Sequence, residues 1–202
     1  MADYFILGVA AFLAGFVDAV VGGGGLIQLP ALFSVFPTSA PASLLGTSKF
    51  AGVWGTSVAA MNYVKAVRLP WTIIVPAGVV AFMFSFAGAI TVTHIPPTYL
   101  RKTLPFILVA IAIYTFWKKD LGAQSKAFYS GRKELLLALF VGGLIGFYDG
   151  FFGPGTGSFL IFLFVKVFAF DFLNASASAK LVNLGTISAS LLFFIPSGNV
   201  LW

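Results

Sequence analysis

Four ionisable side chains lie inside long apolar stretches, and they form two matched sets. Asp18 and Asp149 differ in residue number by 131, and so do Lys49 and Lys180. A charge at the bilayer centre costs about 2.5–3.5 kcal/mol on insertion scales, so such residues face a protein interior or a wet cavity. In one interpretation, the lysines offset the charge of a substrate anion while an aspartate carries a proton or orients a lysine. In the other, each aspartate forms a salt bridge with a lysine and only holds helices together.

Two glycine clusters accompany the aspartates. The first is Gly22–Gly25 and the second is Gly153-Pro154-Gly155-Thr156-Gly157. A helix that begins at such a break directs backbone N–H groups and the positive end of its dipole toward a cavity, which can bind an anion. Broken helices whose N-termini meet near the membrane midplane recur in transporters. The alternative is close packing of helices on small residues.

Hydroxyl and amide side chains lie close to each lysine. Asn183 follows Lys180 by about one helical turn, so the two lie on a similar face. These groups could complete an oxyanion site or form hydrogen bonds between helices. The predicted proton-coupling or salt-bridge residues are Asp18 and Asp149. The predicted substrate-binding residues are Gly22, Gly23, Gly24, Gly25, Thr47, Ser48, Lys49, Gly153, Gly155, Thr156, Gly157, Ser178, Lys180 and Asn183.

Residues for other chemistries are few. The chain has no Cys and one His, His94, so no thiolate or His-rich metal site and no cofactor is expected. The segment Gly46-Thr-Ser-Lys49 lacks the residue order of a phosphate-binding Walker loop. The absence of a nucleophile–base constellation argues against an intramembrane enzyme. Gln28, His94 and Lys166 have no matched partners and are expected to be structural or interfacial.

The elements that must position these residues are membrane helices. Hydrophobic residues make up 59% of the 202 residues, charged residues make up 9%, and the mean hydropathy is +1.01. A soluble domain carries about a quarter charged residues, so lipid must cover much of this chain. The net charge of +6 lies mainly in connectors between apolar stretches, as in cytoplasmic loops. This distribution does not suit nucleic-acid binding.

Six apolar stretches are evident, at about 4–36, 42–64, 69–93, 103–117, 134–170 and 174–196. A single crossing takes about 20 residues, so the first and fifth stretches are too long for one straight helix. Each contains a glycine cluster, which predicts a helix, a break at membrane depth and a second short helix. The N-terminus lacks a basic region, so the first stretch is expected to be a retained membrane segment and not a cleaved signal peptide.

An internal repeat relates the two halves at the same sequence offset that relates the two aspartates. Gly15-Phe-Val-Asp18 recurs as Gly146-Phe-Tyr-Asp149, and Trp71 matches Trp202. We therefore expect a first transmembrane repeat at 1–120, a basic connecting loop at 121–133 and a second transmembrane repeat at 134–202. Counterparts of 72–93 and 103–117 are missing, so the second repeat is expected to be truncated or completed by partner subunits.

Several paired motifs carry a family resemblance that extends over essentially the whole chain. They are the segments 15–30 (GFVDAVVGGGGLIQLP), 46–50 (GTSKF), 146–158 (GFYDGFFGPGTGS) and 179–183 (AKLVN). Together they closely resemble the sulfite exporter TauE/SafE family, also called the toluene-sulfonate uptake permease family. The resemblance implies a bacterial inner-membrane permease for sulfur oxyanions and organosulfonates. It places the two aspartates, the two glycine clusters, Lys49, Lys180 and Asn183 at the signature positions.

The sequence thus predicts an all-α polytopic membrane protein, multi-pass in the bacterial inner membrane, with two homologous repeats and glycine-broken helices. Its predicted function is secondary transport of a small anion such as sulfite or a sulfonate, with a proton as the candidate coupling ion. The expected partners are the anionic substrate, the lipid bilayer and, if the second repeat needs completion, further copies of the chain. The alternative is a non-transporting membrane subunit or scaffold that needs a partner to complete the fold.

Overall fold

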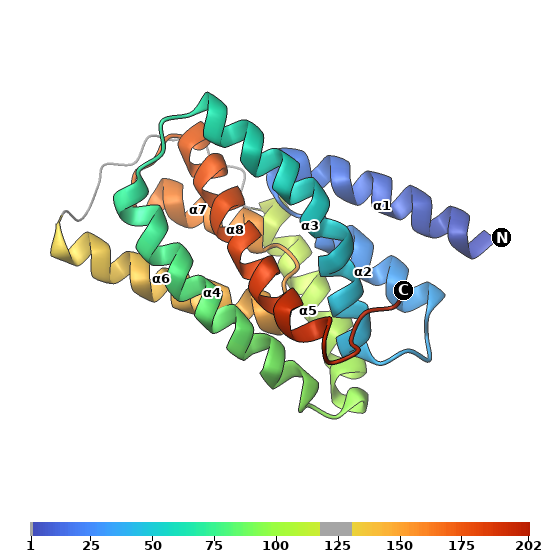
Figure 1. The fold of residues 1–202 in the computed structure, drawn as a ribbon. Helices are drawn as coiled ribbons and strands as arrows, with labels where there is room; N and C mark the ends of the chain where they lie inside the picture. The colour runs from blue at the N-terminus through green and yellow to red at the C-terminus, as the bar shows by residue number, and fades with distance from the viewer. Residues whose placement is uncertain (1, 118–130) are drawn as a thin grey trace.

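Every regular element that the structure describes is an α-helix. The computed structural model describes the backbone of residues 2–117 and 131–202, and the side chains of 5–19, 22–114 and 131–202. The predicted all-α class is therefore confirmed, whereas the predicted loop at 121–133 lies, up to residue 130, outside the described residues. Within the described ranges the helices are α1 Ala2–Val21, α2 Gly25–Val35, α3 Pro41–Ala66, α4 Trp71–Thr93, α5 Pro97–Trp117, α6 Arg132–Phe151, α7 Thr156–Lys166 and α8 Phe172–Phe194 (Figure 1).

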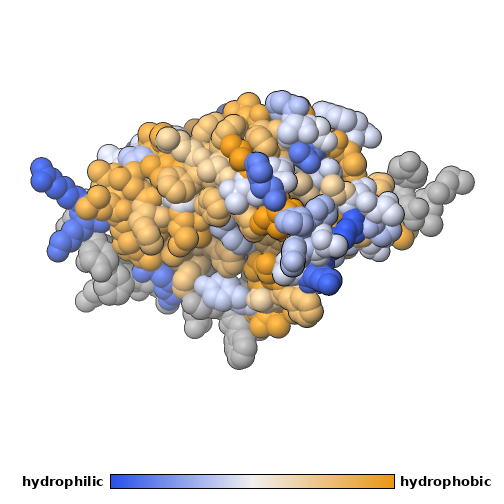
Figure 2. Space-filling model, turned by 90° about the horizontal axis from the view of Figure 1, so that it is seen from below, coloured by the Kyte–Doolittle hydropathy of each residue, from blue (hydrophilic) through white to orange (hydrophobic). Residues whose placement is uncertain are grey.

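Three of the described helices have the length and composition of membrane segments. Among the described residues, α4, α6 and α8 are long and apolar enough to cross a bilayer, with mean hydropathies of 2.2, 1.6 and 1.3 over an 18-residue segment of each. Helices α2 and α7 have 11 residues each, too few for the roughly 20 that a crossing needs. Large apolar side chains such as Phe12 and Phe106 are exposed. Figure 2 shows broad hydrophobic areas on the face it presents, as expected for contact with lipid.

Both long apolar stretches are broken at their glycines, as the sequence predicts. Helix α1 ends at Val21 and α2 begins at Gly25, and between them Gly22 has φ of +78°. Helix α6 ends at Phe151 and α7 begins at Thr156, with φ of +97° at Gly153 and +82° at Gly155. Glycine adopts positive φ without the steric cost that a Cβ imposes. The chain can therefore turn at these positions without a strained side chain.

Helix boundaries in the two halves follow the offset found in the sequence. Helices α2 and α7 begin at residues 25 and 156, and α3 and α8 begin at 41 and 172, so both pairs of starts have a difference of 131. Helices α1 and α6 end at residues 21 and 151, a difference of 130. The order of long helix, break, short helix and long helix therefore occurs twice among the described residues.

Helices α4 and α6 approach each other closely along a line of small residues. A Cβ atom built on Gly142, Gly146 or Gly150 would lie only 2.4, 2.3 or 1.8 Å from a carbonyl oxygen of α4. Small residues at four-residue spacing let helix backbones pack together in a membrane. The three oxygens belong, in the same order, to Ala77, Ala81 and Ser85, which are also spaced by four.

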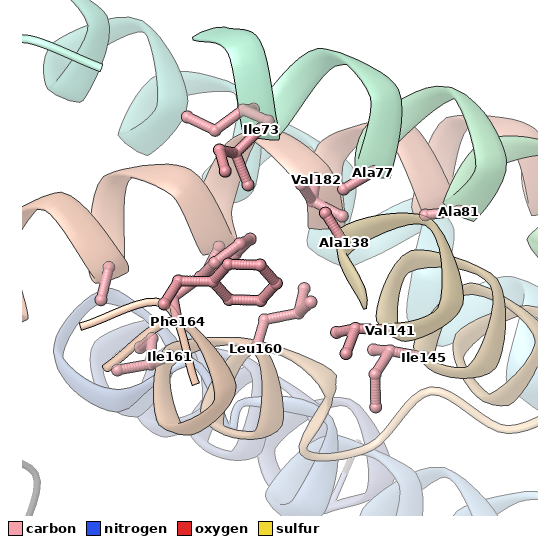
Figure 3. Packing of buried hydrophobic residues seen from close by; sticks show 14 of the residues in the cluster. Ile73, Ala77, Ala81, Ala138, Val141, Ile145, Leu160, Ile161, Phe164 and Val182 are labelled. Carbon is pink, nitrogen blue, oxygen red and sulfur yellow. The ribbon is translucent and has the colours of Figure 1, made fainter. Parts of the chain in front are cut away.

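Helices α7 and α8 pack against this helix pair through apolar side chains. Buried Leu160 and Phe164 of α7 pack in one cluster with Ile73 of α4, Ala138 of α6 and Val182 of α8 (Figure 3). The cluster holds α8 against α7 and α4, next to the turn of α8 that carries Lys180. A second apolar cluster joins α2, α3, α5 and the end of α8, and contains Leu29, Leu44, Leu104 and Phe194.

Candidate functional site

The two glycine breaks, far apart in the sequence, touch each other. A Cβ atom on Gly22 would lie 2.9 Å from the Cα atom of Gly157, and a Cβ atom on Gly157 would lie 2.6 Å from the carbonyl oxygen of Gly22. Real Cβ atoms are not found this close to backbone, so only glycine fits on either side. The contact brings the start of α2 and the start of α7 together in the interior of the protein.

Two ion pairs cross between the halves beside this contact. Lys49 Nζ of α3 lies 2.9 Å from Asp149 Oδ2 of α6. Lys180 Nζ of α8 lies 2.6 Å from Asp18 Oδ2 of α1, and it also donates to the Asp18 carbonyl oxygen at 2.6 Å. Each lysine thus reaches the aspartate of the other half. Only Asp18 is appreciably accessible, with 25% of its side chain exposed against 7%, 2% and 4% for Lys49, Asp149 and Lys180.

Glycines leave room for both ion pairs. A Cβ atom on Gly153 would lie 3.0 Å from Lys49 Nζ and 3.3 Å from Asp149 Oδ1. A Cβ atom on Gly24 would lie 2.8 Å from Asp18 Cβ, and the Gly24 N–H donates a long hydrogen bond of 3.4 Å to Asp18 Oδ1. The Asp18 carboxylate therefore sits where the first turn of α2 offers a backbone N–H group to an anion.

A cavity of about 570 Å³ opens onto this region. Its lining includes Asp18, Lys49 and Asp149, together with the amide of Asn183. Among the described residues, Asn183 Oδ1 is buried and has no hydrogen-bond partner. Buried polar atoms are normally paired, so this unpaired amide oxygen suits a guest that donates a hydrogen bond. The two lysines and two aspartates together carry no net formal charge.

The structure places most of the predicted site residues at this cavity. Gln28 also lines it and accepts a hydrogen bond of 3.0 Å from Ser48 Oγ, although only a structural or interfacial role was expected for Gln28 from the sequence. Its amide in the first turn after a glycine break was the signal for it. The predicted residues that line the cavity are Asp18, Gly22, Gly24, Gly25, Ser48, Lys49, Asp149, Gly153, Gly155, Gly157 and Asn183.

The remaining predicted residues do not line the cavity. Thr47 Oγ1 donates to the Ser43 carbonyl oxygen and accepts from the Leu201 N–H, so it fastens the C-terminal segment to α3. Thr156 Oγ1 donates to the Gly153 carbonyl oxygen at 2.7 Å within the break. Ser178 Oγ donates to the Asn174 carbonyl oxygen within α8. Lys180 reaches the cavity through Asp18, and Gly23 packs near the side chain of Ser158.

Comparison with known proteins relates the sequence of this chain to membrane transporters. The family model described as sulfite exporter TauE/SafE matches residues 7–202. A probable membrane transporter protein, ORF9, of Sinorhizobium sp is 37% identical over 195 residues, which cover 96% of this chain and 73% of the relative. The probable membrane transporter protein YfcA of Escherichia coli K12 is 36% identical over 207 residues, covering 100% and 75%. A Haemophilus influenzae relative of similar description is 36% identical, covering 98% and 76%. No solved structure matches the chain.

Proposed function

The chain belongs to the sulfite exporter TauE/SafE family of membrane transporters, and from this premise we propose that it carries a small oxyanion, sulfite or an organic sulfonate, across the bilayer. It is a multi-pass membrane transporter and not an enzyme, as its sequence predicts. The observation that carries the substrate proposal is the pair of crossed Lys–Asp bridges beside two glycine breaks that touch. The family description supplies the class of anion.

The substrate takes the place of an aspartate carboxylate beside a lysine. A sulfite or sulfonate group resembles a carboxylate in having charged oxygens that accept hydrogen bonds. In the structure the Asp18 carboxylate accepts from Lys180 Nζ and from the Gly24 N–H. When Asp18 is protonated, Lys180 and the first turn of α2 become available to the oxyanion. Charge-assisted hydrogen bonds of this kind are stronger than neutral ones, so they favour the anion over water.

A proton accompanies each negative charge of the substrate. The site holds two lysines and two aspartates, so an anion that enters alone leaves an unbalanced charge in a low-dielectric interior. Asp18 is the proposed proton carrier because it is the more exposed aspartate and lines the cavity. The charged groups that face it are Lys180 from α8 and, across the cavity, Lys49 of α3 and Asp149 of α6.

Two homologous structural units complete the proposal. The first comprises residues 1–120 and the second residues 134–202, joined by 121–133. Support comes from the helix starts that repeat at one constant offset and from the cross-unit pairing of Lys49 with Asp149 and Lys180 with Asp18. Each unit then contributes one break, one lysine and one aspartate to a shared site.

Uptake into reconstituted vesicles tests the transport site. We expect Lys49→Gln and Lys180→Gln to abolish uptake of radiolabelled sulfite, and thermal stabilisation by sulfite, while both variants still insert and remain helical. The matched control is Lys65→Gln, because Lys65 is an exposed lysine in the last turn of α3, the same helix as Lys49. Wild-type uptake and stabilisation in both site variants would reject the site. Folded wild-type protein without flux for any oxyanion favours the second candidate, a non-transporting membrane subunit. The uncovered glycines Gly15, Gly52 and Gly55 of α1 and α3 support this candidate.

A further inference from the structure

One wall of the cavity is an open groove of small residues between α1 and α3. A Cβ atom built on Gly15, Gly52 or Gly55 would meet no atom within 4 Å. Large apolar side chains of the same two helices are exposed, with 73% for Phe12 of α1 and 64% for Trp54 of α3. The small residues that line it are Ala11, Gly15 and Ala19 of α1 and Gly52, Gly55 and Ala59 of α3.

The corresponding positions of the second half are also mostly small or short, but there a helix covers them. Gly142, Gly146 and Gly150 of α6 correspond to the three residues of α1, and all three are buried against the backbone of α4. Thr186 and Ser190 of α8 correspond to Gly55 and Ala59. Ser85 Oγ of α4 donates to the Thr186 carbonyl oxygen at 2.7 Å and lies 3.3 Å from Ser190 Oγ.

We propose that the groove between α1 and α3 binds a further membrane-spanning helix, an apolar segment equivalent to α4 with small residues at four-residue spacing. The proposal rests on the two-unit arrangement and is independent of the substrate. Small residues in a membrane favour helix contact because they let two backbones approach. About a quarter of each relative named above lies outside the matched stretch, so the relatives have length for such a helix.

Two features of the chain select this occupant. Asp18 is 25% exposed at the cavity, and a charged side chain near the bilayer centre needs protein or water around it, so the groove is unsuited to lipid tails alone. The α4 helix of a second copy of the chain cannot bind the groove through its small residues. That helix already uses the small face of Ala77, Ala81 and Ser85 against its own α6.

Disulfide cross-linking tests the groove directly, since the chain has no native cysteine. The probe is a synthetic peptide with the sequence of α4, Trp71–Thr93, carrying Ala81→Cys. It is added to the full chain carrying Gly15→Cys in lipid vesicles. In the structure Gly146 faces Ala81, so the corresponding Gly15 is expected to face the peptide cysteine. We expect several-fold more cross-linked product than with Leu13→Cys. Leu13 is exposed, and so is its counterpart Leu144, at 45% and 59%.

A groove-filling variant shows whether the contact is specific. A Cβ atom on Gly52 would meet no atom within 4 Å, so we expect Gly52→Leu to fold and its side chain to occupy the groove from the α3 side. It is expected to reduce the yield at Gly15→Cys to that of the Leu13→Cys control. Equal yields at residues 13 and 15, or a yield that Gly52→Leu leaves unchanged, would overturn the proposal. Disulfide dimers of Gly15→Cys whose yield is not lowered by excess peptide would also overturn it, because a second copy would then occupy the groove.

Discussion

Each buried lysine of the cavity region is held by an aspartate from the other half of the chain, and burial makes the pair sensitive to the loss of one member. Asp149→Asn leaves Lys49 charged, 7% exposed and without its carboxylate. Removing one partner of a buried ion pair costs about 3–5 kcal/mol. We expect the free energy of unfolding in detergent, followed by circular dichroism in denaturant, to fall by about this amount.

Swapping the two charges of the pair tests whether the lost stability comes from the ion pair itself or from any substitution at these positions. The double variant Lys49→Asp/Asp149→Lys restores opposite charges at the same two positions, and we expect it to recover part of the lost stability. Glu134→Gln is the control, because Glu134 is a half-buried carboxylate in the first turn of the same helix, α6. Removing a favourable charge from the end of a helix lowers the free energy of unfolding by about 0.3–1 kcal/mol. A loss as large in Glu134→Gln as in Asp149→Asn contradicts the ion-pair explanation.

Gly22 combines a positive φ with a backbone contact, so a methyl group is costly there for two reasons. Its φ is +78°, and a Cβ atom would lie 2.9 Å from Gly157. Backbone strain of this kind costs about 1–3 kcal/mol. We expect Gly22→Ala to lower the melting temperature in detergent. The control Gly8→Ala, in α1 with open space around its Cβ position, should leave it unchanged or raise it slightly. Equal melting temperatures for the two variants would exclude the proposed contact.

At the scale of helices, the line of glycines on α6 determines how closely α4 can pack. A Cβ atom at Gly146 would lie 2.3 Å from the carbonyl oxygen of Ala81, whereas one at Gly15 would meet nothing within 4 Å. We expect Gly146→Ala to separate α4 from α6 and to lower the free energy of unfolding by about 1–3 kcal/mol, the usual cost of overpacking. Gly15→Ala is the matched control and should lower the free energy of unfolding much less. Thermal unfolding of the two purified variants compares them.

The start of α8 depends on a cap at Asp171. The Asp171 side chain accepts hydrogen bonds from the Asn174 side-chain amide and from the N–H groups of Asn174 and Leu173, and these bonds lower the pKa of Asp171. Asp171→Ala should cost about 1 kcal/mol, as for other N-caps. Because the pKa is lower in the folded state, the contribution is complete above the unfolded pKa and is lost as the pH falls through the folded pKa. Unfolding measured as a function of pH should therefore show a stability difference between the wild type and Asp171→Ala that is present at neutral pH and disappears in acid.

Elements near charged or glycine-rich residues were predictable, and their tertiary partners were not. An aspartate or lysine in an apolar stretch is costly. Four glycines in a row, or three glycines interspersed with a proline and a threonine, do not extend a helix stably, so Asp18, Lys180 and both breaks were evident in the sequence. The identity of each ion pair was not, because sequence spacing does not say which helices are neighbours. Gln28 and the open groove escaped detection for the same reason, since both depend on what faces them across the cavity.

At the scale of the whole molecule, the balanced charges of the site predict that transport moves no net charge. A monovalent sulfonate that enters with one proton on Asp18 adds one negative and one positive charge to a site whose four ionised groups sum to zero. The membrane potential acts on net charge, at about 2.3 kcal/mol per charge per 100 mV. Movement of the anion alone would then change its accumulation about fiftyfold for 100 mV. We expect a potassium diffusion potential across vesicles to change sulfonate uptake little, and an imposed pH gradient to drive it.

Asp18→Asn separates proton coupling from binding in the same assay. An asparagine resembles the protonated aspartate, so Lys180 remains available to the anion while the coupled proton is lost. We expect the variant to bind sulfonate, to lose its response to the pH gradient and to gain a response to the potential, because the anion now moves alone. Asp171→Asn is the control, because Asp171 is an aspartate outside the cavity and should preserve the wild-type responses. Potential-driven uptake in the wild type, or an unchanged pH response in Asp18→Asn, contradicts a proton carried at residue 18.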